Sequence, residues 1–222
     1  MSEWIDLTAS DGHRVSAYVA RPTTKPVGAV VIAQEVFGVN SHIQDVANGY
    51  ARDGFLAIAP SFFDRIERGI ALGYERPDVE RGLALTKQLD VAQTVMDAQA
   101  AIDHARKTGP TGMVGYCWGG TTSWTCAAQA NGLAAAVCYY GGGIIANGTL
   151  TPRCPVMIYW AELDTIIPID KARDFIASHP KIEHHTYPAD HGFNCNLRGS
   201  YHEPSAALAK TRTLAFLRKH LG

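Results

Sequence analysis

The stretch VGYCWGG, residues 114–120, decides the fold of this chain because it sets a cysteine between glycines at a fixed spacing. Its core, GYCWG, matches the glycine–any–nucleophile–any–glycine pattern, in which a strand turns sharply into a helix. The central residue of that turn is held in a strained backbone conformation. A side chain at either glycine would collide with the neighbouring strand or helix. One short match is weak evidence, so Cys117 needs partners elsewhere in the chain.

The bulk composition is that of an ordinary globular protein. The 222 residues suit one domain, 1–222, with 46% hydrophobic and 18% charged residues. A formal charge of −1 and the lack of a long basic run predict no binding to nucleic acid or to a membrane surface. No signal peptide is visible, and no apolar run approaches the roughly 20 residues that span a bilayer. We therefore expect a cytoplasmic protein.

Strand and helix patterns alternate along the chain. Expected strands lie at 3–8 and 13–20 (a hairpin), 27–35, 55–60, 111–116, 134–140, 155–160 and 181–188. Expected helices lie at 42–52, 79–107 with a break near Asp90, 118–130, 169–178 and 203–220. This alternation predicts an α/β fold with a mostly parallel, doubly wound sheet, helices on both faces, and chemistry at the carboxyl ends of its strands. Residues 61–78 form either a loop near the site entrance or a surface excursion.

Two further residues follow expected strands and suit a catalytic triad. Asp164 follows the strand 155–160, although an aspartate there also serves as a turn former or a helix cap, and Glu162 is a rival. His191 follows the strand ending near Tyr187, whereas none of the other eight histidines is placed as well. The order cysteine, aspartate, histidine is that of the α/β-hydrolase triad.

Glu35 ends the long apolar strand, where a carboxylate is costly unless it meets a partner. It is either a salt-bridge anchor or a second carboxylate beside the thiol. The five cysteines include no CxxC pair, so we expect free thiols. Cys117 itself is a nucleophile, a small residue in a tight turn, or a redox thiol. The redox alternative lacks a near partner, because Cys126 lies two to three helical turns further on.

Taken together, these residues resemble the dienelactone hydrolase family of α/β hydrolases. The resemblance covers nearly the whole chain and rests on AQEVFGVN (33–40), VGYCWGG (114–120), CYYGGG (138–143), LDTIIP (163–168) and HGF (191–193). It implies that Cys117 is the nucleophile, His191 the base and Asp164 its orienting acid. It also implies that Glu35 keeps the resting thiol protonated and hydrogen-bonded, then helps to generate the thiolate when substrate binds.

The resemblance extends to the surroundings of the triad. It implies an oxyanion hole made by the backbone N–H groups of Trp118 and Val36, and substrate contacts from Phe37 and Phe193. Trp118 is bulky, so it either narrows the acyl pocket or packs under the turn. The reaction requires no metal and no organic cofactor. The expected partner is a small-molecule ester or lactone, and the expected state is a monomer.

The chain departs from the namesake enzymes in its arginines. Those enzymes hold a substrate carboxylate with one arginine shortly after the triad histidine and another before the long helix. Here residues 192–195 contain no arginine, and Arg198 lies three residues further on. Arg81, with Arg76 as rival, is the counterpart of the second. We therefore expect a thiol-dependent ester or lactone hydrolase; the alternatives are a carboxylesterase for small neutral esters and a ligand-binding relative without turnover.

Overall fold

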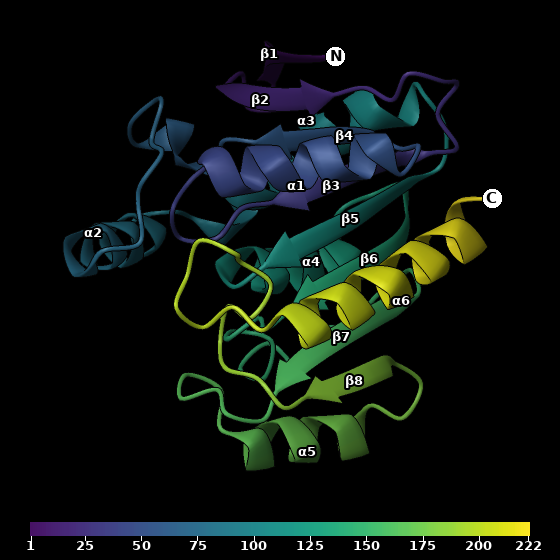
Figure 1. Cartoon of the computed structure of the whole chain (residues 1–222). Helices are drawn as coiled ribbons and strands as arrows, with labels where there is room; N and C mark the ends of the chain where they lie inside the picture. Colours follow the sequence, from purple (N-terminus) through teal and green to yellow (C-terminus); the bar gives the residue numbers. More distant parts are fainter.

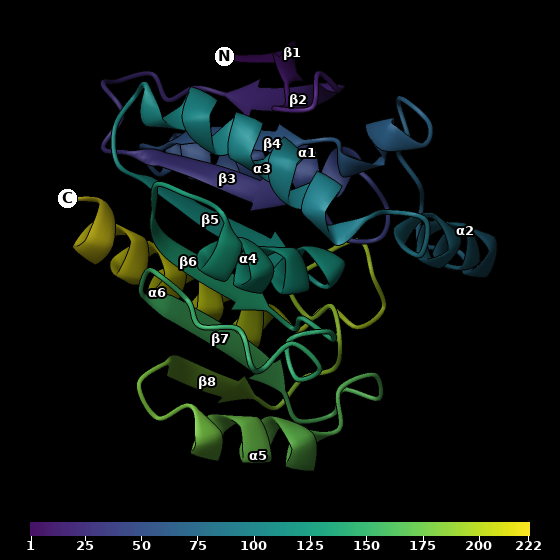
Figure 2. The ribbon, with the colours of Figure 1, turned by 180° about the vertical axis from the view of Figure 1, so that it is seen from behind.

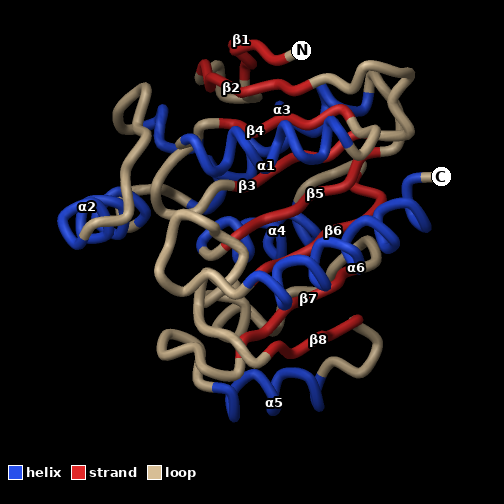
Figure 3. The backbone as a smooth tube through the Cα atoms, viewed as in Figure 1, coloured by secondary structure: helices blue, strands red, loops and turns tan.

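All eight strands of the computed structural model, which describes residues 1–222, belong to one sheet (Figures 1 and 3). The order across the sheet is β1-β2-β4-β3-β5-β6-β7-β8. The strands are β1 (Ser2–Thr8), β2 (Arg14–Ala20), β3 (Ala29–Ala33), β4 (Leu56–Pro60), β5 (Thr111–Tyr116), β6 (Leu133–Tyr139), β7 (Val156–Ala161) and β8 (Glu183–Tyr187). From β4 to β8 all neighbours are parallel, whereas β1 and β2 form an antiparallel edge. The expected hairpin and the mostly parallel sheet are confirmed.

Helices cover both faces of this sheet. Helices α1 (Ser41–Arg52) and α6 (Glu203–Leu221) lie on the face seen in Figure 1, and α3 (Val91–Arg106) and α4 (Trp118–Gln129) lie on the opposite face, seen in Figure 2. Helix α5 (Ile169–Ser178) lies beside β8, and α2 (Arg76–Thr86) stands off the sheet on the side where the parallel strands end. The larger core cluster fills the α1 and α6 side and a second packs under α3. No helix combines the length and the apolar character that crossing a membrane requires.

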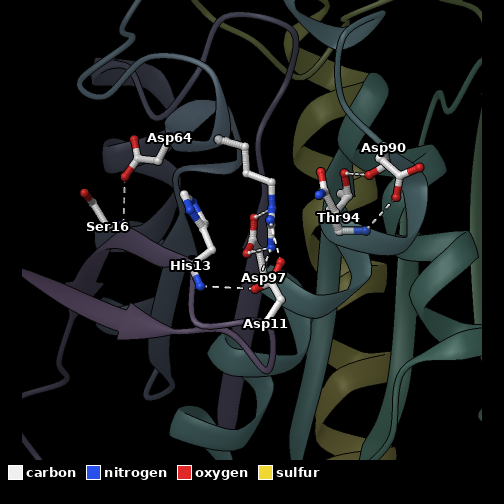
Figure 4. Close-up of polar contacts among 9 residues, drawn as sticks. Asp11, His13, Ser16, Asp64, Asp90, Thr94 and Asp97 are labelled. Atoms are coloured by element: carbon white, nitrogen blue, oxygen red, sulfur yellow. Dashed lines mark hydrogen bonds and ion pairs between the residues drawn. The ribbon is translucent and has the colours of Figure 1, made fainter.

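The helix boundaries follow local capping chemistry. Asn40 begins α1 by accepting a hydrogen bond from the Ile43 amide at 3.3 Å. Asp90 begins α3 by accepting one from the Gln93 amide at 3.0 Å, and its carbonyl accepts from Thr94 (Figure 4). An N-cap residue has an extended backbone, so the helical pattern over 79–107 is interrupted there. The predicted break near Asp90 is confirmed.

A buried arginine fastens the antiparallel edge to the rest of the molecule. Arg65, in the short helix η1 (Phe62–Arg65), donates to both oxygens of Asp97 in α3, at 2.8 and 2.7 Å, and to Asp11 at 2.7 Å. Beside it, Asp64 accepts from the backbone of Ser16 in β2 at 2.8 Å (Figure 4). The start of the irregular segment 61–78 therefore joins the hairpin to α3.

The rest of segment 61–78 covers the loop that follows β3. Leu72 donates its backbone N–H to the Phe37 carbonyl at 2.8 Å, and the Asn40 side chain donates to the Leu72 carbonyl at 3.0 Å. Gly38, with φ +79°, forms an isolated bridge to Ala71, and a Cβ at Gly38 would overlap the backbone carbonyl of Ile70. The segment therefore packs on the loop that carries Glu35. This favours the interpretation as a loop near the site over that of a surface excursion.

Candidate active site

The turn between β5 and α4 has the backbone that its glycines predict. Cys117 lies between strand and helix with φ 56° and ψ −117°, a backbone conformation that residues other than glycine rarely adopt. A Cβ at Gly115 would overlap the Gly119 carbonyl in the helix, and one at Gly119 would overlap the Ala33 carbonyl at the end of β3. Both expected collisions are confirmed. The tight turn holds Cys117 at the carboxyl edge of the sheet.

Three side chains from three strand ends meet at this edge. Cys117 Sγ lies 3.1 Å from His191 Nε2, and His191 Nδ1 lies 2.8 Å from Asp164 Oδ2. The other oxygen of Asp164 accepts from the backbone N–H groups of Ile166 and Ile167 at 2.8 and 2.9 Å. A carboxylate held in this way accepts from Nδ1 and leaves Nε2 facing the sulfur. The structure therefore brings together the three residues that the chain order selected.

The electrostatics of this group favour the charged form of His191. Burial disfavours the imidazolium, but the hydrogen bonds that it donates to Asp164 and Cys117 outweigh burial and raise the pKa of His191 to about 10. The amino terminus of α4 stabilises negative charge on the sulfur. The buried ring of Tyr140 lies 5.1 Å from the imidazole, between ring centroids. Chemically, such an arrangement can supply a nucleophile, a base and an orienting acid.

Glu35 lies at the same edge but does not bond to the thiol. Its side chain follows β3 and is 1% exposed, and one oxygen accepts from Arg198 Nη1 at 3.3 Å. The other oxygen, Oε2, has no hydrogen-bond partner. The expected hydrogen bond from the resting thiol to Glu35 is absent, because the sulfur faces His191 and the carboxylate faces Arg198. The salt-bridge interpretation of Glu35 describes its contact in this structure.

Arg198 is the functional candidate that the sequence reasoning set aside. Successive tight turns coil the loop after β8, and His202 closes it with a backbone bond to Phe193 at 3.0 Å. The coil returns the guanidinium to Gly192, where φ is +81° and any Cβ would overlap it. The guanidinium carbon also lies 5.7 Å from the Phe37 ring centroid. The glycine directly after His191 was the one available signal, because it marks a close approach.

The two arginines proposed from the resemblance are occupied at the surface. Arg81 pairs with Glu67 at 3.0 Å, and Arg76 pairs with Glu80 at 2.9 Å along the same helix. Arg76 is 90% exposed in its side chain. Neither arginine forms a hydrogen bond or an ion pair with Cys117, Asp164 or His191. The arginine that contacts the site is Arg198.

The two phenylalanines have different surroundings. Phe37 is buried and packs edge-on against Tyr74, with ring centroids 4.6 Å apart. Phe193 is fully buried, with ring centroids 5.2 Å from Tyr140 and 5.3 Å from Tyr187. Phe193 therefore offers no surface to a substrate and supports the ring of Tyr140 instead, contrary to the contact expected from the resemblance.

The two backbone amides expected to form an oxyanion hole donate no hydrogen bond to a loop or turn carbonyl. This holds for the Val36 N–H and for the Trp118 N–H, and Trp118, as the first residue of α4, also has no acceptor within its helix. The indole of Trp118 packs on Phe62 and Phe63, with ring centroids 5.6 and 6.2 Å away. The indole thus packs under the turn, and its backbone N–H stays available.

Comparisons with known proteins agree on one family. The family model described as "Dienelactone hydrolase family" matches residues 15–221. Carboxymethylenebutenolidase 1 from Cupriavidus pinatubonensis is 30% identical over 229 residues, covering 98% of this chain and 97% of its own. Carboxymethylenebutenolidase from Pseudomonas putida is 31% identical over 228 residues, covering 98% and 96%.

A solved structure gives the same result. A Klebsiella pneumoniae protein that carries a dienelactone hydrolase name superposes with a TM-score of 0.79 at 29% identity, covering 97% of this chain and 98% of its own. A metagenomic dienelactone hydrolase-like phosphotriesterase superposes with a TM-score of 0.76 at 20% identity, covering 100% and 99%. The second likeness concerns the fold alone.

Proposed function

Since this chain belongs to the dienelactone hydrolase family, whose reaction is the hydrolysis of an ester or lactone bond, we propose that it cleaves a small-molecule substrate through a thioester on Cys117. The observation that carries the proposal is the contact of 3.1 Å between Cys117 Sγ and His191 Nε2. A thiol paired with an imidazole that a carboxylate orients is an activated nucleophile. A ligand-binding relative without turnover would have no need of such a pair.

The first half of the reaction forms the acyl-enzyme. The Cys117 thiolate attacks the carbonyl carbon, and the carbonyl π electrons move onto oxygen. The N–H groups of Val36 and Trp118 stabilise that oxyanion, a contribution of about 3 kcal/mol per donor in hydrolases. His191, as the imidazolium, gives its Nε2 proton to the departing oxygen as the bond to the acyl carbon breaks. A lactone opens in this step, and its alcohol or enol stays attached to the acyl group.

The second half restores the enzyme. Neutral His191 accepts a proton from water at Nε2, and the water oxygen attacks the thioester carbon. When the tetrahedral intermediate collapses, the carbon–sulfur bond breaks and Cys117 leaves as the thiolate beside a newly charged imidazolium. Asp164 stays ionised throughout and stabilises that charge. The products are a carboxylic acid and an alcohol or enol.

Arg198 and Glu35 suggest how an acidic substrate enters this cycle. Arg198 holds Glu35 by one contact of 3.3 Å, which is long for a charge-assisted hydrogen bond. A carboxylate on the substrate would compete with Glu35 for the guanidinium. The displaced Glu35 could then accept the proton of a Cys117 thiol and generate the thiolate. This favours an acidic lactone over a neutral ester, although the arginine comes from a different position than the resemblance implied.

Substrate choice and alkylation test this proposal together. We would measure hydrolysis of p-nitrophenyl acetate and of cis- and trans-dienelactone, before and after iodoacetamide labelling mapped to Cys117. Cys117→Ala and His191→Ala should abolish turnover and leave the fold intact, whereas the control Cys154→Ser should keep it. Full activity in Cys117→Ala would overturn the mechanism. Turnover of the simple ester alone would favour a carboxylesterase, and an unreactive Cys117 without turnover would favour a binding protein.

The location and assembly of the protein stay predictions from the sequence. We propose a cytoplasmic monomer that acts on a free small molecule. Analytical ultracentrifugation tests the monomer, and fractionation of the native cell tests the compartment. A stable dimer would overturn the first expectation without affecting the chemistry at Cys117.

A further inference from the structure

A buried cluster next to the candidate active site gathers three side chains of the kinds that ligate metal ions. Glu35 comes from the end of β3, His42 from the first turn of α1, and Cys195 from the coiled loop after β8. One ligand atom of each residue lies within 4.8 Å of those of the other two. The three residues are 1%, 4% and 0% exposed. Two neighbouring segments and one distant loop thus place a carboxylate, an imidazole and a thiol around one point.

Two polar atoms of this cluster are not satisfied by the protein. Glu35 Oε2 and His42 Nε2 are buried and have no hydrogen-bond partner. No hydrogen bond joins Glu35, His42 and Cys195 to one another either, although they are close neighbours. Buried polar atoms in native proteins nearly always have a partner. Glu35 Oε2 and His42 Nε2 each offer an unpaired lone pair at one point, which indicates a bound group that accepts both lone pairs, as a metal ion does.

We propose that Glu35, His42 and Cys195 bind one divalent transition-metal ion of the Zn²⁺ type, and that this ion inhibits hydrolysis by holding Glu35 in place. The inhibitory part rests on the function proposed above. Thiolate, imidazole and carboxylate are the ligand set of tetrahedral Zn²⁺, and three protein ligands leave a fourth position for water. Mg²⁺ and Ca²⁺ prefer oxygen ligands, so they do not fit.

The geometry requires only a small contraction. Bond lengths of about 2.0–2.3 Å place neighbouring ligands of tetrahedral Zn²⁺ roughly 3.3–3.8 Å apart. The ligand atoms here are within 4.8 Å, so inward shifts of about 1 Å complete the site. Binding replaces the Cys195 proton by the metal, which forms the metal–sulfur bond and releases one proton to solvent.

Groups around the cluster are placed to orient such ligands. Arg198 occupies the other oxygen of Glu35, which leaves Oε2 free for the metal. The Tyr74 hydroxyl lies beside the Cys195 sulfur and accepts from the Asn40 side chain at 3.1 Å. Ligating residues usually have outer hydrogen bonds of this kind, which fix their orientation.

A route from solvent reaches the cluster. A cavity of about 460 Å³ lies beside α1 and α6, and its lining includes His42, Asn194 and Asn196. The lining also includes the carboxylates of Asp45 and Glu203 and the cationic side chains of Arg52 and Lys210, so the formal charges around the opening balance. Of the three cluster residues only His42 lines this cavity, and Cys117 does not, so an ion entering here would meet His42 first.

Cobalt serves as the optical probe for this site. Titration of Co²⁺ into the reduced, metal-free protein should give a 1:1 complex with an intense sulfur-to-cobalt band in the near ultraviolet. Cys195→Ser should lose that band, and His42→Gln should weaken binding by roughly 100-fold or more, since loss of outer partners alone costs 10- to 100-fold. Two thiol controls, Cys117→Ser and Cys154→Ser, should keep the band. Zn²⁺ should displace Co²⁺ and raise the Tm of the wild type but not of Cys195→Ser.

The same variants separate the site from its effect on turnover. Zn²⁺ should inhibit wild type and Cys154→Ser reversibly, with activity restored by EDTA, while Cys195→Ser stays active and insensitive. A cobalt band that disappears in Cys117→Ser but persists in Cys195→Ser would overturn the site, as would the absence of a stoichiometric complex. The Co²⁺ complex without inhibition by Zn²⁺ would support the site and overturn both the inhibition and the role proposed for Glu35.

Discussion

Two arginine–carboxylate pairs in this molecule each contain a buried carboxylate but are built differently. Arg65 donates hydrogen bonds to both oxygens of Asp97 at 2.8 and 2.7 Å, and the exposed fractions of the two side chains are 8% and 0%. Arg198 touches one oxygen of Glu35 at 3.3 Å, and its own side chain is 22% exposed. The first carboxylate has both oxygens satisfied. The second keeps one oxygen without a partner.

The difference separates an arginine–carboxylate pair suited to stability from one suited to exchanging its partner. A bidentate pair has its hydrogen bonds fixed by the fork of the guanidinium, so breaking it leaves buried charges without compensation. Breaking a single long contact costs little free energy when a competing anion or cation takes the place of one partner. Arg65 accordingly joins the turn between β1 and β2, through Asp11, to η1 and α3, whereas Arg198 lies beside Gly192 at the candidate active site.

The largest effect expected from this comparison is on stability. Asp97→Ala should lower the free energy of unfolding by about 3–5 kcal/mol, because it leaves the buried guanidinium of Arg65 without its main partner. Urea unfolding followed by circular dichroism measures this change. The kcat of the folded fraction should stay near that of the wild type.

A matched control lies on the same helix. Asp103 is 58% exposed in its side chain and meets Arg106 only at 4.0 Å. Asp103→Ala should change the free energy of unfolding by less than about 0.5 kcal/mol. Equal losses in the two variants would contradict the structural role of the Arg65 pair.

The next effect is on catalysis. Glu35→Gln should lower kcat/KM by about 100-fold or more, in the range of a lost proton-transfer group, because the amide cannot accept the thiol proton. Its free energy of unfolding should change by less than about 1 kcal/mol, since the side chain keeps its shape and the contact that it loses is long. Steady-state kinetics and urea unfolding on the same preparation separate the two effects.

Glu67→Gln is the control for that substitution, because Glu67 pairs with the exposed Arg81 on the surface. It should leave both quantities unchanged. If Glu35→Gln destabilised the protein as much as Asp97→Ala while kcat/KM stayed normal, the two pairs would be equivalent and Glu35 would be an anchor.

The sequence predicted the sheet and the triad because both depend on short-range patterns. Continuous apolar runs identify strands buried on both faces, and parallel strands place their carboxyl ends at one edge. Cys117, Asp164 and His191 each follow such a strand, so their meeting follows from the topology. The glycines of GYCWG likewise predicted steric collisions that the structure contains.

The partners of Glu35 could not be predicted in the same way. Arg198 lies seven residues after His191, and only the successive turns of the loop at 190–202 bring it back. The pairing of Arg65 with Asp97, 32 residues apart, depends on how η1 packs on α3. Distances of this kind are set by tertiary packing, for which one sequence carries no periodic signal. The same applies to the meeting of Glu35 with His42 and Cys195.

A smaller effect distinguishes the geometry of the two arginines. Arg65→Lys should lower the free energy of unfolding by roughly 1.5–3 kcal/mol, because an ammonium group cannot reproduce the paired hydrogen bonds to Asp97. Arg198→Lys should cost less than about 1 kcal/mol, since its one long contact needs no fork. Chemical unfolding of both variants in one buffer makes the comparison. A larger loss for Arg198→Lys would mean that its single contact understates its structural role.

The smallest effect concerns the exposed arm of the Arg65 network and depends on pH. Hydrogen bonds from the Arg65 guanidinium and from the His13 backbone lower the pKa of Asp11 to about 2. A depressed pKa in the folded state stabilises the protein above the unfolded value, near 3.9, and this contribution disappears as the pH falls through the folded value. Asp11→Asn should therefore have a slightly lower Tm than the wild type at pH 6. The gap should narrow below pH 4, and salt should reduce it because the pair is exposed.

Thermal unfolding of both proteins between pH 3 and 7 measures the gap. A gap that stays constant over this range would show that Asp11 contributes through the shape of its turn and not through its charge.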